Sequence, residues 1–388
     1  MLIGRRELSG GLIASIAATK LSLSPTPAQA KRSYKGPNVI IVRFGGGVRR
    51  RETIVSKTTY APFLLNVLTK RGVLIPDLRI SQLDGVDTSH AEGTLNLLTG
   101  RYLSYRLVES RFLSGNLEPT QPTLFEYFRK AFDVPAHRAL LINGEDRPQE
   151  EFFSFGVHGH FGVDYRAQVL SLHRFKLYWL KRKIERSAGT DKEIIAAKKQ
   201  LAELRAKTPR DHTLLETPEL SKFWERWRRY FGESGFVNPR GDRLLTELAL
   251  RALNELQPQL MMINYQDPDY VHWGNASHYT RAISVIDEGL KQLATAVDAH
   301  PLMRNNTIFV IVPDCGRDAN PLMGVPFQHH FNSRSAHEIW ALIFGPGIGR
   351  NKTLDKPVDQ IRIAATVGGL MGLRTPQAEA SAIEVIWS

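Results

Sequence analysis

The sequence predicts a three-layer α/β/α fold, in which helices cover both faces of a mainly parallel central sheet. Short apolar runs rich in β-branched residues, which are typical of buried strands, recur along the chain. Amphipathic segments with helical spacing separate these runs. Strands that alternate with helices form a parallel sheet with helices on either side, so this order indicates the fold class.

The expected elements follow one another along the chain. The N-terminal part is expected to contain a strand at 37–43, a helix at 60–70, a strand at 74–80, helices at 94–99 and 123–132, and a strand at 138–142. The C-terminal part is expected to contain a helix at 242–256, a strand at 260–264, a helix at 279–297, and strands at 307–312 and 338–344. Gly100 is expected to end the helix at 94–99.

Residues 164–232 differ from the rest of the chain because helical, basic and aromatic patterns replace the strand patterns. We predict an inserted helical cap here, on an α/β core formed by 31–163 and 233–388. Basic residues interleaved with aromatics can bind nucleic acid. We instead expect the aromatic residues to form the buried stripe of the helices and the charges their solvated face, so nucleic acid is not an expected partner.

The first 30 residues have the pattern of a twin-arginine (Tat) signal peptide. Arg5 and Arg6 precede a mildly apolar stretch at 10–23, and a small-residue cleavage pattern ends at Ala30. The apolar stretch is shorter and more polar than the about 20 apolar residues that span a membrane. We therefore expect the mature protein to start near Lys31, to have no membrane span, and to be located in the periplasm or outside the cell.

The composition restricts the class of protein and the partners that can be expected. The 388 residues are 42% hydrophobic and 23% charged, which suits a globular protein with a sizeable core. The net charge of +12 favours an anionic substrate or partner. The single cysteine, Cys315, excludes an internal disulfide framework. The oligomeric state is left open.

Residues that ligate metals occur at three places in the C-terminal half. They are Asp267, Asp269 and His272 after the strand at 260–264, Asp314 and Cys315 after the strand at 307–312, and His329, His330 and His337 further on. The carboxyl ends of parallel strands meet at one edge of a sheet, so these side chains are expected to converge there. Carboxylate and imidazole suit zinc first, and manganese or iron second. The sequence therefore predicts a site for one or two divalent metals.

This order of motifs resembles the alkaline phosphatase superfamily, which includes sulfatases, nucleotide pyrophosphatases and phosphonoacetate hydrolases. The resemblance runs from about 38 to 349. It rests on Leu-Thr-Gly at 98–100, on Asp269-Tyr-Val-His272, on the strand and loop at 307–317, and on His337 with Phe-Gly-Pro-Gly at 344–347. It implies an alkaline-phosphatase-like fold and metal-dependent hydrolysis of a phosphate or sulfate ester. It also implies a metal site of Asp269, His272 and His337, with His330 as a rival third ligand.

Three positions depart from the family pattern. Gly45 stands where the first strand normally ends in a metal-binding Asp, and Cys315 stands where the second metal has a His. His90 stands at the nucleophile position, ten residues before the Gly of Thr-Gly. His90, Asp314 and Cys315 could form a rebuilt second site, since all three side-chain types bind zinc. Zinc there would supply hydroxide from water near neutral pH, so no covalent intermediate would be needed.

Other roles stay open. Ser89 and its neighbour Thr88 are alternative nucleophiles if the loop is shifted by one residue, and His90 is itself an alternative phosphoryl acceptor. Arg317 is expected either to pair bidentately with an anionic substrate or to form an ordinary surface salt bridge. Two functions follow: an exported hydrolase of a small anionic ester, or a non-catalytic relative that binds an anionic ligand or partner.

Overall fold

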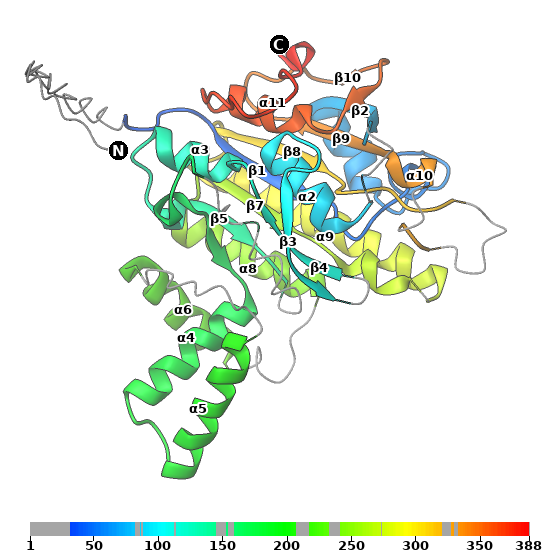
Figure 1. Ribbon diagram of the computed structural model, residues 1–388. Helices are drawn as coiled ribbons and strands as arrows, with labels where there is room; N and C mark the ends of the chain where they lie inside the picture. Colours follow the sequence, from blue (N-terminus) through cyan, green and yellow to red (C-terminus); the bar gives the residue numbers. More distant parts are fainter. Residues whose placement is uncertain are drawn as a thin grey trace, which may run out of the picture. The chain divides into compact units, whose positions relative to one another are not determined.

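A mixed, mostly parallel sheet forms the centre of the computed structural model (Figure 1). The structure describes residues 32–387 except 82–85, 87, 112–113, 145–152, 154–158, 207–216, 233–240, 273, 320–326 and 330–332. In this part of the chain the strand order is β10-β2-β9-β8-β1-β7-β5-β6, and β11 also pairs with β2. The sheet strands are β1 (Asn38–Arg43), β2 (Gly72–Arg79), β5 (Ala139–Ile142), β6 (Gln168–Leu170), β7 (Leu260–Asn264), β8 (Thr307–Val312), β9 (Glu338–Phe344), β10 (Lys352–Thr353) and β11 (Val358–Asp359).

The predicted mainly parallel sheet is confirmed. Strand β9 is antiparallel to both β8 and β2, and the other described pairs of this central sheet are parallel. Strand β1 lies between β7 and β8, with Arg43 opposite Asn264 and Val312. The last residues of these three strands are therefore in register, and the segments that follow them leave the sheet at one edge.

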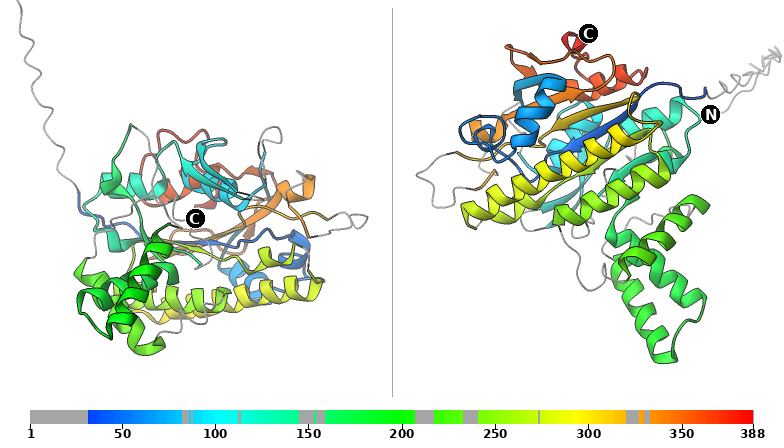
Figure 2. Two further views of the ribbon diagram at one scale, coloured as in Figure 1. Left: turned by 60° about the horizontal axis from the view of Figure 1, so that its bottom comes forward. Right: turned by 180° about the vertical axis from the view of Figure 1, so that it is seen from behind.

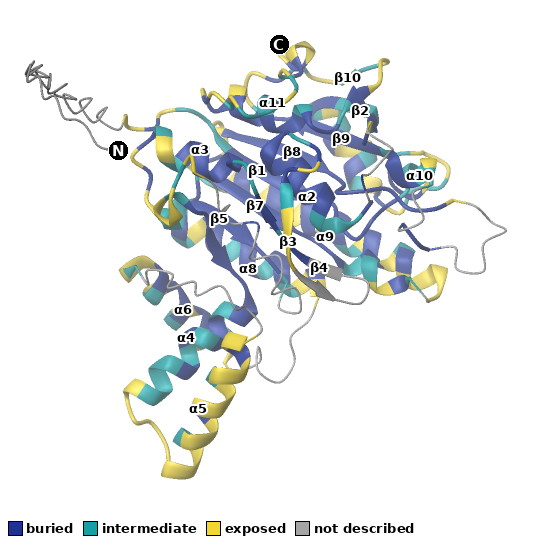
Figure 3. Cartoon of the chain, viewed as in Figure 1, coloured by how far each residue is buried: buried dark blue, intermediate teal, exposed yellow. Residues whose placement is uncertain are grey.

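Helices cover both faces of the sheet, as the sequence predicts. Val39 and Ile41 belong to one buried cluster together with residues of α2 (His90–Thr99), α3 (Leu124–Ala131) and α11 (Arg362–Leu370). Ile40 and Val42 belong to a second cluster, with residues of α8 (Gly241–Leu256) and α9 (Ala276–Ala299). Figure 2 shows α8 and α9 side by side along one face, and Figure 3 shows the buried strands between the two helical layers. Because side chains alternate along β1, one strand serves both cores.

Shorter elements complete the fold. Strands β3 (Tyr105–Arg111) and β4 (Ser114–Pro119) form a separate antiparallel hairpin. The remaining short helices and turns are α1 (Arg50–Thr53), η1 (Leu64–Leu68), η2 (Thr69–Arg71), η3 (Ala136–Arg138), η5 (Val163–Tyr165), η6 (Asp267–Val271), α10 (Arg334–His337) and η7 (Glu384–Ile386). The helix expected at 60–70 is thus a π-helical turn followed by a 3-10 turn. Helix α2 ends at Gly100, as predicted.

The region predicted as a helical cap contains α4 (Leu172–Glu185), α5 (Asp191–Ala206) and α6 (Pro218–Phe231). Its predicted beginning at 164 needs correction, because β6 lies within it and pairs with β5. Three residues were too short a run to predict a strand, since only pairing with β5 completes it. The aromatic residues Phe175, Trp224 and Trp227 are buried, so they form the apolar stripe that the sequence predicts. Arg32–Ser388 forms one compact unit, to which these helices belong.

Among the described residues, no helix combines the length and the apolar character needed to cross a membrane. The predicted export segment lies outside the described residues.

Candidate metal centre

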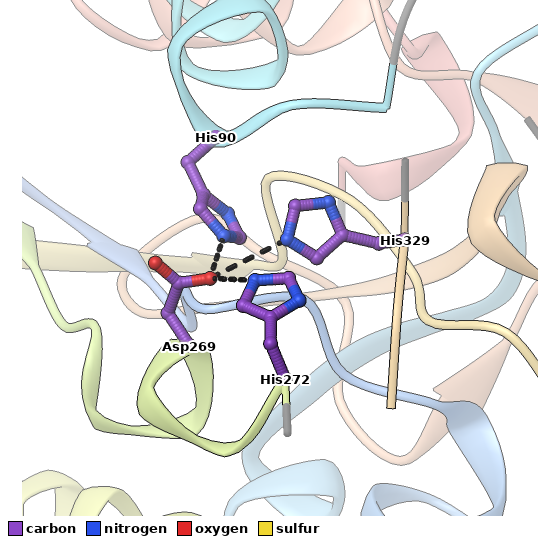
Figure 4. A group of neighbouring side chains, drawn as sticks. All are labelled: His90, Asp269, His272 and His329. Carbon is purple, nitrogen blue, oxygen red and sulfur yellow. Dashed lines mark hydrogen bonds and ion pairs between the residues drawn. The ribbon is translucent and has the colours of Figure 1, made fainter. Parts of the chain in front are cut away.

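Three imidazole rings and one carboxylate meet at the edge where β1, β7 and β8 end (Figure 4). The Nε2 atoms of His90 and His272 each lie 2.7 Å from Oδ1 of Asp269, and Nε2 of His329 lies 3.4 Å from the same oxygen. Asp269 and His272 come from η6 and the residue after it, and His90 is the first residue of α2. His329 comes from a loop, so side chains from three separate segments of the chain meet beside Oδ1 of Asp269.

Each imidazole also has a fixed acceptor at its other ring nitrogen. The distances from Nδ1 are 2.9 Å from His90 to Oδ2 of Asp314, 2.9 Å from His272 to Oε1 of Gln328, and 2.6 Å from His329 to the carbonyl oxygen of Thr88. An acceptor at Nδ1 places a proton on that nitrogen and directs the Nε2 lone pair to the other side of the ring. The Nε2 atoms of His272 and His329 therefore present lone pairs to the Asp269 carboxylate.

A positive charge is needed at this point. Lone pairs that face a carboxylate oxygen repel it unless a proton or a metal cation lies between them. Carboxylate oxygen and imidazole nitrogen are ligands of zinc and of other first-row divalent metals. Acceptors that orient the far side of the imidazoles are the usual surroundings of metal-binding histidines. The donor set and its surroundings thus fit a divalent metal held by His90, Asp269, His272 and His329.

The turn that carries Asp269 is held by a reciprocal pair of aspartates. Asp242, in the first turn of α8, accepts hydrogen bonds from the backbone N–H of Gln266 at 2.9 Å and of Asp267 at 2.8 Å. The Asp267 carboxylate accepts in return from the N–H of Asp242 at 3.1 Å. Burial, and then the Asp267 charge, raise the pKa of Asp242 well above its ordinary value. This pair fixes η6 to the N-terminus of α8 and so places Asp269.

His90 also belongs to a second cluster, with Asp314 and Cys315. Its Nδ1 lies 2.9 Å from Oδ2 of Asp314 and 3.7 Å from Sγ of Cys315. The predicted convergence of these three residues is therefore observed. The same ring reaches the Asp269 cluster through Nε2, so His90 bridges two groups that the sequence predicts as separate sites.

Arg43 supplies positive charge to this second cluster. The residue is 1% exposed, and its Nε lies 3.7 Å from Oδ2 of Asp314. Its Nη1 donates to Oγ1 of Thr94 in α2 at 2.8 Å. The buried charge of Asp314 is thus compensated by Arg43 and His90 within the protein, as buried charges require.

The charges of the two clusters are coupled. Burial favours the neutral form of His90, but the charges of Asp269 and Asp314 outweigh it and raise the pKa of His90 well above 6.5. Burial also opposes the charge of Asp314, but His90 and Arg43 lower its pKa to about 2. Burial, and then Asp314, raise the pKa of the Cys315 thiol to about 12. Without a metal, His90 is thus a cation between two carboxylates, and Cys315 is a neutral thiol.

Gly45 explains why the Asp of the family pattern is missing. A Cβ atom at this position would lie 2.1 Å from the carbonyl oxygen of Tyr265, far inside contact distance. The segments after β1 and β7 pass one another so closely that only glycine fits. The first strand therefore contributes no ligand from this position.

Arg317 does not occupy either predicted role, because its side chain is fully buried. Its guanidinium donates to the carbonyl oxygens of Gly47 at 2.8 Å and Pro268 at 3.0 Å, and also to those of Gly46 and Phe327. A buried guanidinium needs acceptors, and the turn after β1 turns its carbonyls toward it. Arg317 thus ties together three segments of the site and is a positioning residue.

The remaining predicted site residues lie as follows. His337 is outside both clusters of the described residues, and its Nδ1 lies 3.0 Å from the carbonyl oxygen of Ile80. His329, rather than His337, lies in the cluster around Asp269, and His337 is the last residue of α10. His330 lies outside the described residues. Ser89 is the N-cap of α2; its Oγ accepts from the N–H of Glu92 and lies 3.2 Å from Oε2 of the same residue.

The sequence names His329 as a candidate ligand but favours His337 or His330 as the third ligand, and it does not identify Gln328 or Arg43. The His329-His330 pair signals a ligand, but the position of each imidazole depends on the loop backbone. Thr88 holds His329, since its carbonyl accepts from His329 and its hydroxyl donates to the His329 carbonyl. Arg43 ends a strand of apolar residues, and this buried position is itself unusual for an arginine.

Comparisons with known proteins agree with the fold. Neither a known protein family nor a curated protein matches the sequence. Among solved structures, the wild-type alkaline phosphatase PafA is similar with a TM-score of 0.57 at 10% identity, over 92% of this chain and 100% of that one. A 2-O GAG sulfatase is similar with a TM-score of 0.53 at 12% identity, over 90% and 74%. A putative sulfatase from Bacteroides thetaiotaomicron is similar with a TM-score of 0.51 at 13% identity, over 90% and 74%. The chain therefore has the fold of the alkaline phosphatase superfamily, as its sequence motifs predict.

Proposed function

We propose that this chain is an exported, metal-dependent hydrolase of a phosphate or sulfate ester, with one divalent metal held by His90, Asp269, His272 and His329. The observation that carries the proposal is the convergence of three imidazole Nε2 atoms on one carboxylate oxygen, with an acceptor behind each ring. Zinc is the first choice and manganese the second, because the ligands are imidazole and carboxylate. The fold shared with phosphatases and sulfatases supports the reaction class.

Water is the favoured nucleophile. A divalent metal at such a site polarises an ester oxygen and lowers the pKa of water toward about 7. His90, at the position of the usual nucleophile, has both ring nitrogens engaged by carboxylates. Ser89 serves as the cap of α2, with its hydroxyl beside Glu92. Neither side chain is positioned as a free nucleophile, so hydrolysis would proceed without a covalent enzyme intermediate.

A single metal is the favoured stoichiometry. A binuclear site needs a ligand from the end of the first strand, and Gly45 cannot carry one. The cation expected beside Asp314 is replaced by Arg43, whose Nε lies 3.7 Å from that carboxylate. Asp314 then acts on the chemistry indirectly: it holds the Nδ1 proton of His90 and so keeps Nε2 directed at the metal.

Export completes the proposal. The twin arginine at positions 5 and 6 and the cleavage pattern that ends at Ala30 support passage through the twin-arginine route into the periplasm or beyond. The net charge of +12 supports a small anionic ester as the substrate.

One observation favours a second candidate, a non-catalytic relative that binds an anionic ligand or partner. The position of the family nucleophile holds His90, which the site uses to bind the metal or to bridge two carboxylates. A chain that had lost catalysis would tolerate this replacement while it kept the fold and one metal.

Metal analysis and turnover together test both candidates. The protein is isolated from the periplasm, its metal content is measured, and the nitrophenyl esters of phosphate, sulfate and phosphonate are assayed with zinc or manganese added. We expect one metal per chain and turnover of one ester class. His272→Ala should lose both metal and turnover, and Ser89→Ala should keep both. One bound metal without turnover of any ester would select the binder, and a wild-type protein that takes up no metal would exclude the metal-dependent hydrolase.

A further inference from the structure

A cavity borders the turn that carries Asp269. It has a volume of about 530 Å³ and is lined by residues of α4, α8, α9 and η6 and by the residues that follow β5. This size falls within the range of about 300–1,000 Å³ that is typical of sites for small molecules. None of the four proposed metal ligands lines it, so it is distinct from the metal centre.

Much of the wall of this cavity is apolar. Leu245 and Leu248 contribute from α8, Ala282 and Val285 from α9, and Val271 from η6. All except Val285 are buried. Walls of this kind bind an aliphatic or aromatic group by removing its surface from water.

Polar residues also line the cavity, and two of them, Arg281 and Asn143, can select the rest of the ligand. The carboxylate of Asp267, which lines it too, accepts from the backbone N–H of Asp242. Arg281 lines it, is exposed to solvent, and forms no ion pair with a described residue. Asn143 also lines it and is 1% exposed; its Oδ1 accepts from Asn264 Nδ2 at 2.6 Å, but its own Nδ2 has no acceptor among the described residues. A buried donor without an acceptor beside a cavity indicates that a ligand or water completes it.

We propose that this cavity binds an apolar organic anion, such as an aryl or medium-chain alkyl acid, with its hydrocarbon part between α8 and α9 and its charge beside Arg281. The apolar walls would contact the hydrocarbon part, and the Arg281 guanidinium would pair with the negative charge. The Nδ2 of Asn143 would donate a hydrogen bond to an acceptor atom of the ligand. The inference does not rest on the proposed hydrolase activity, because the site shares no ligand with the metal centre and its test measures binding rather than turnover.

Two probes that differ only in charge test the proposal. Anilinonaphthalene sulfonate carries the predicted negative charge, and N-phenylnaphthylamine has the same rings without it. We expect the sulfonate to bind the folded chain more tightly than the amine. Arg281→Gln should weaken binding of the sulfonate by roughly fivefold, as expected for the loss of an exposed ion pair, and leave binding of the amine unchanged. Lys291→Gln makes the same charge change on α9 outside the cavity and should alter neither probe.

A filling variant tests the location. Val285→Trp places a large ring at the cavity wall and should abolish binding of both probes while the protein keeps its circular dichroism spectrum. Unchanged binding of both probes to folded Val285→Trp would overturn the proposal. Equal weakening of sulfonate binding in Arg281→Gln and Lys291→Gln would also overturn the proposal, because the attraction would then be a non-specific effect of net charge. Arg281 is exposed to solvent, so Arg281→Gln should fold and can be tested even if Val285→Trp does not fold.

Discussion

Gln328 holds His272 by two hydrogen bonds. Its Nε2 donates to the carbonyl oxygen of His272 at 2.9 Å, and its Oε1 lies 2.9 Å from Nδ1 of the same ring. Because the Nε2 contact fixes which end of the amide faces the ring, the proton of the imidazole lies on Nδ1. The Nε2 lone pair of His272 is thereby directed at Asp269, which is the orientation that a metal ligand needs.

The first prediction follows from this pair. Gln328→Leu should weaken metal binding by about 10- to 100-fold, the usual effect of losing a group that orients a ligand. Gln328→Glu keeps an acceptor for Nδ1 and should lose less. Affinity is measured by competition with a chromogenic chelator. Gln292→Leu, on the exposed side of α9, is the matched control and should bind as the wild type does. Equal affinities in Gln328→Leu and the control would remove Gln328 from the site.

The second prediction separates two histidines. His329→Ala should lose most of its bound metal, because its Nε2 is one of the three directed at Asp269. His337→Ala should keep its metal, because its Nδ1 contacts the carbonyl oxygen of Ile80 and the residue lies in neither cluster. Metal content of the two purified variants is compared by mass spectrometry. The reverse result would restore His337 as the third ligand.

The third prediction concerns pH. The pKa of His90 is raised well above 6.5, because Asp269 and Asp314 outweigh its burial. The folded protein therefore holds this proton more tightly than the unfolded chain. The stabilising contribution of charged His90 is fully present below an unfolded pKa of about 6.5 and is lost as pH rises through the folded pKa.

Thermal unfolding with a chelator present measures this effect. The Tm of the metal-free wild type should fall toward alkaline pH, and His90→Asn should lack that part of the fall. The metal replaces the Nε2 proton, so the metal-loaded protein should not show the same loss. Parallel Tm curves for the chelated wild type and His90→Asn would contradict the coupling of His90 to the two carboxylates.

The fourth prediction concerns the single thiol. Cys315 is fully buried, and burial followed by the charge of Asp314 raises its pKa to about 12. The thiolate is the reactive species, so the native protein should resist iodoacetamide near neutral pH. Mass spectrometry should find the label on Cys315 only after denaturation. Rapid labelling of the native protein would show that the thiol is accessible and ionised.

The fifth prediction tests whether the missing family ligand can be restored. Gly45→Asp should not create a second metal site, because its Cβ would lie 2.1 Å from the Tyr265 carbonyl oxygen. We expect a loss of at least about 3 kcal/mol in unfolding free energy, the upper end for overpacked sites. Gly159→Asp, at a position with no atom within 4 Å, is the control and should be nearly neutral. A stable Gly45→Asp protein with two metals per chain would refute this account.

The sequence by itself determined the fold class and most of the elements. Strands β7, β8 and β9 lie at the predicted residues, because strands buried on both faces form nearly continuous apolar runs, here with a polar residue only at one end of each strand. The edge at which ligands gather was also predictable, since parallel strands bring their carboxyl ends together. Asp269, His272 and Asp314 were predicted from their positions after those strands, and His90 from the nucleophile position of the family that the sequence resembles.

Only the tertiary structure decided how these residues are grouped. The choice of His329 over His337, and the bridging of both clusters by His90, depend on loop paths and on ring orientation. Arg317 donates to backbone carbonyls that are far away in sequence, and Arg43 pairs with the buried carboxylate of Asp314, which is equally distant. The periodicity of apolar residues shows which face of a helix or strand is buried. Loop residues have no such periodicity, so the contacts between loops cannot be predicted from it. One such contact is the close passage of the segments after β1 and β7, which the missing side chain of Gly45 permits.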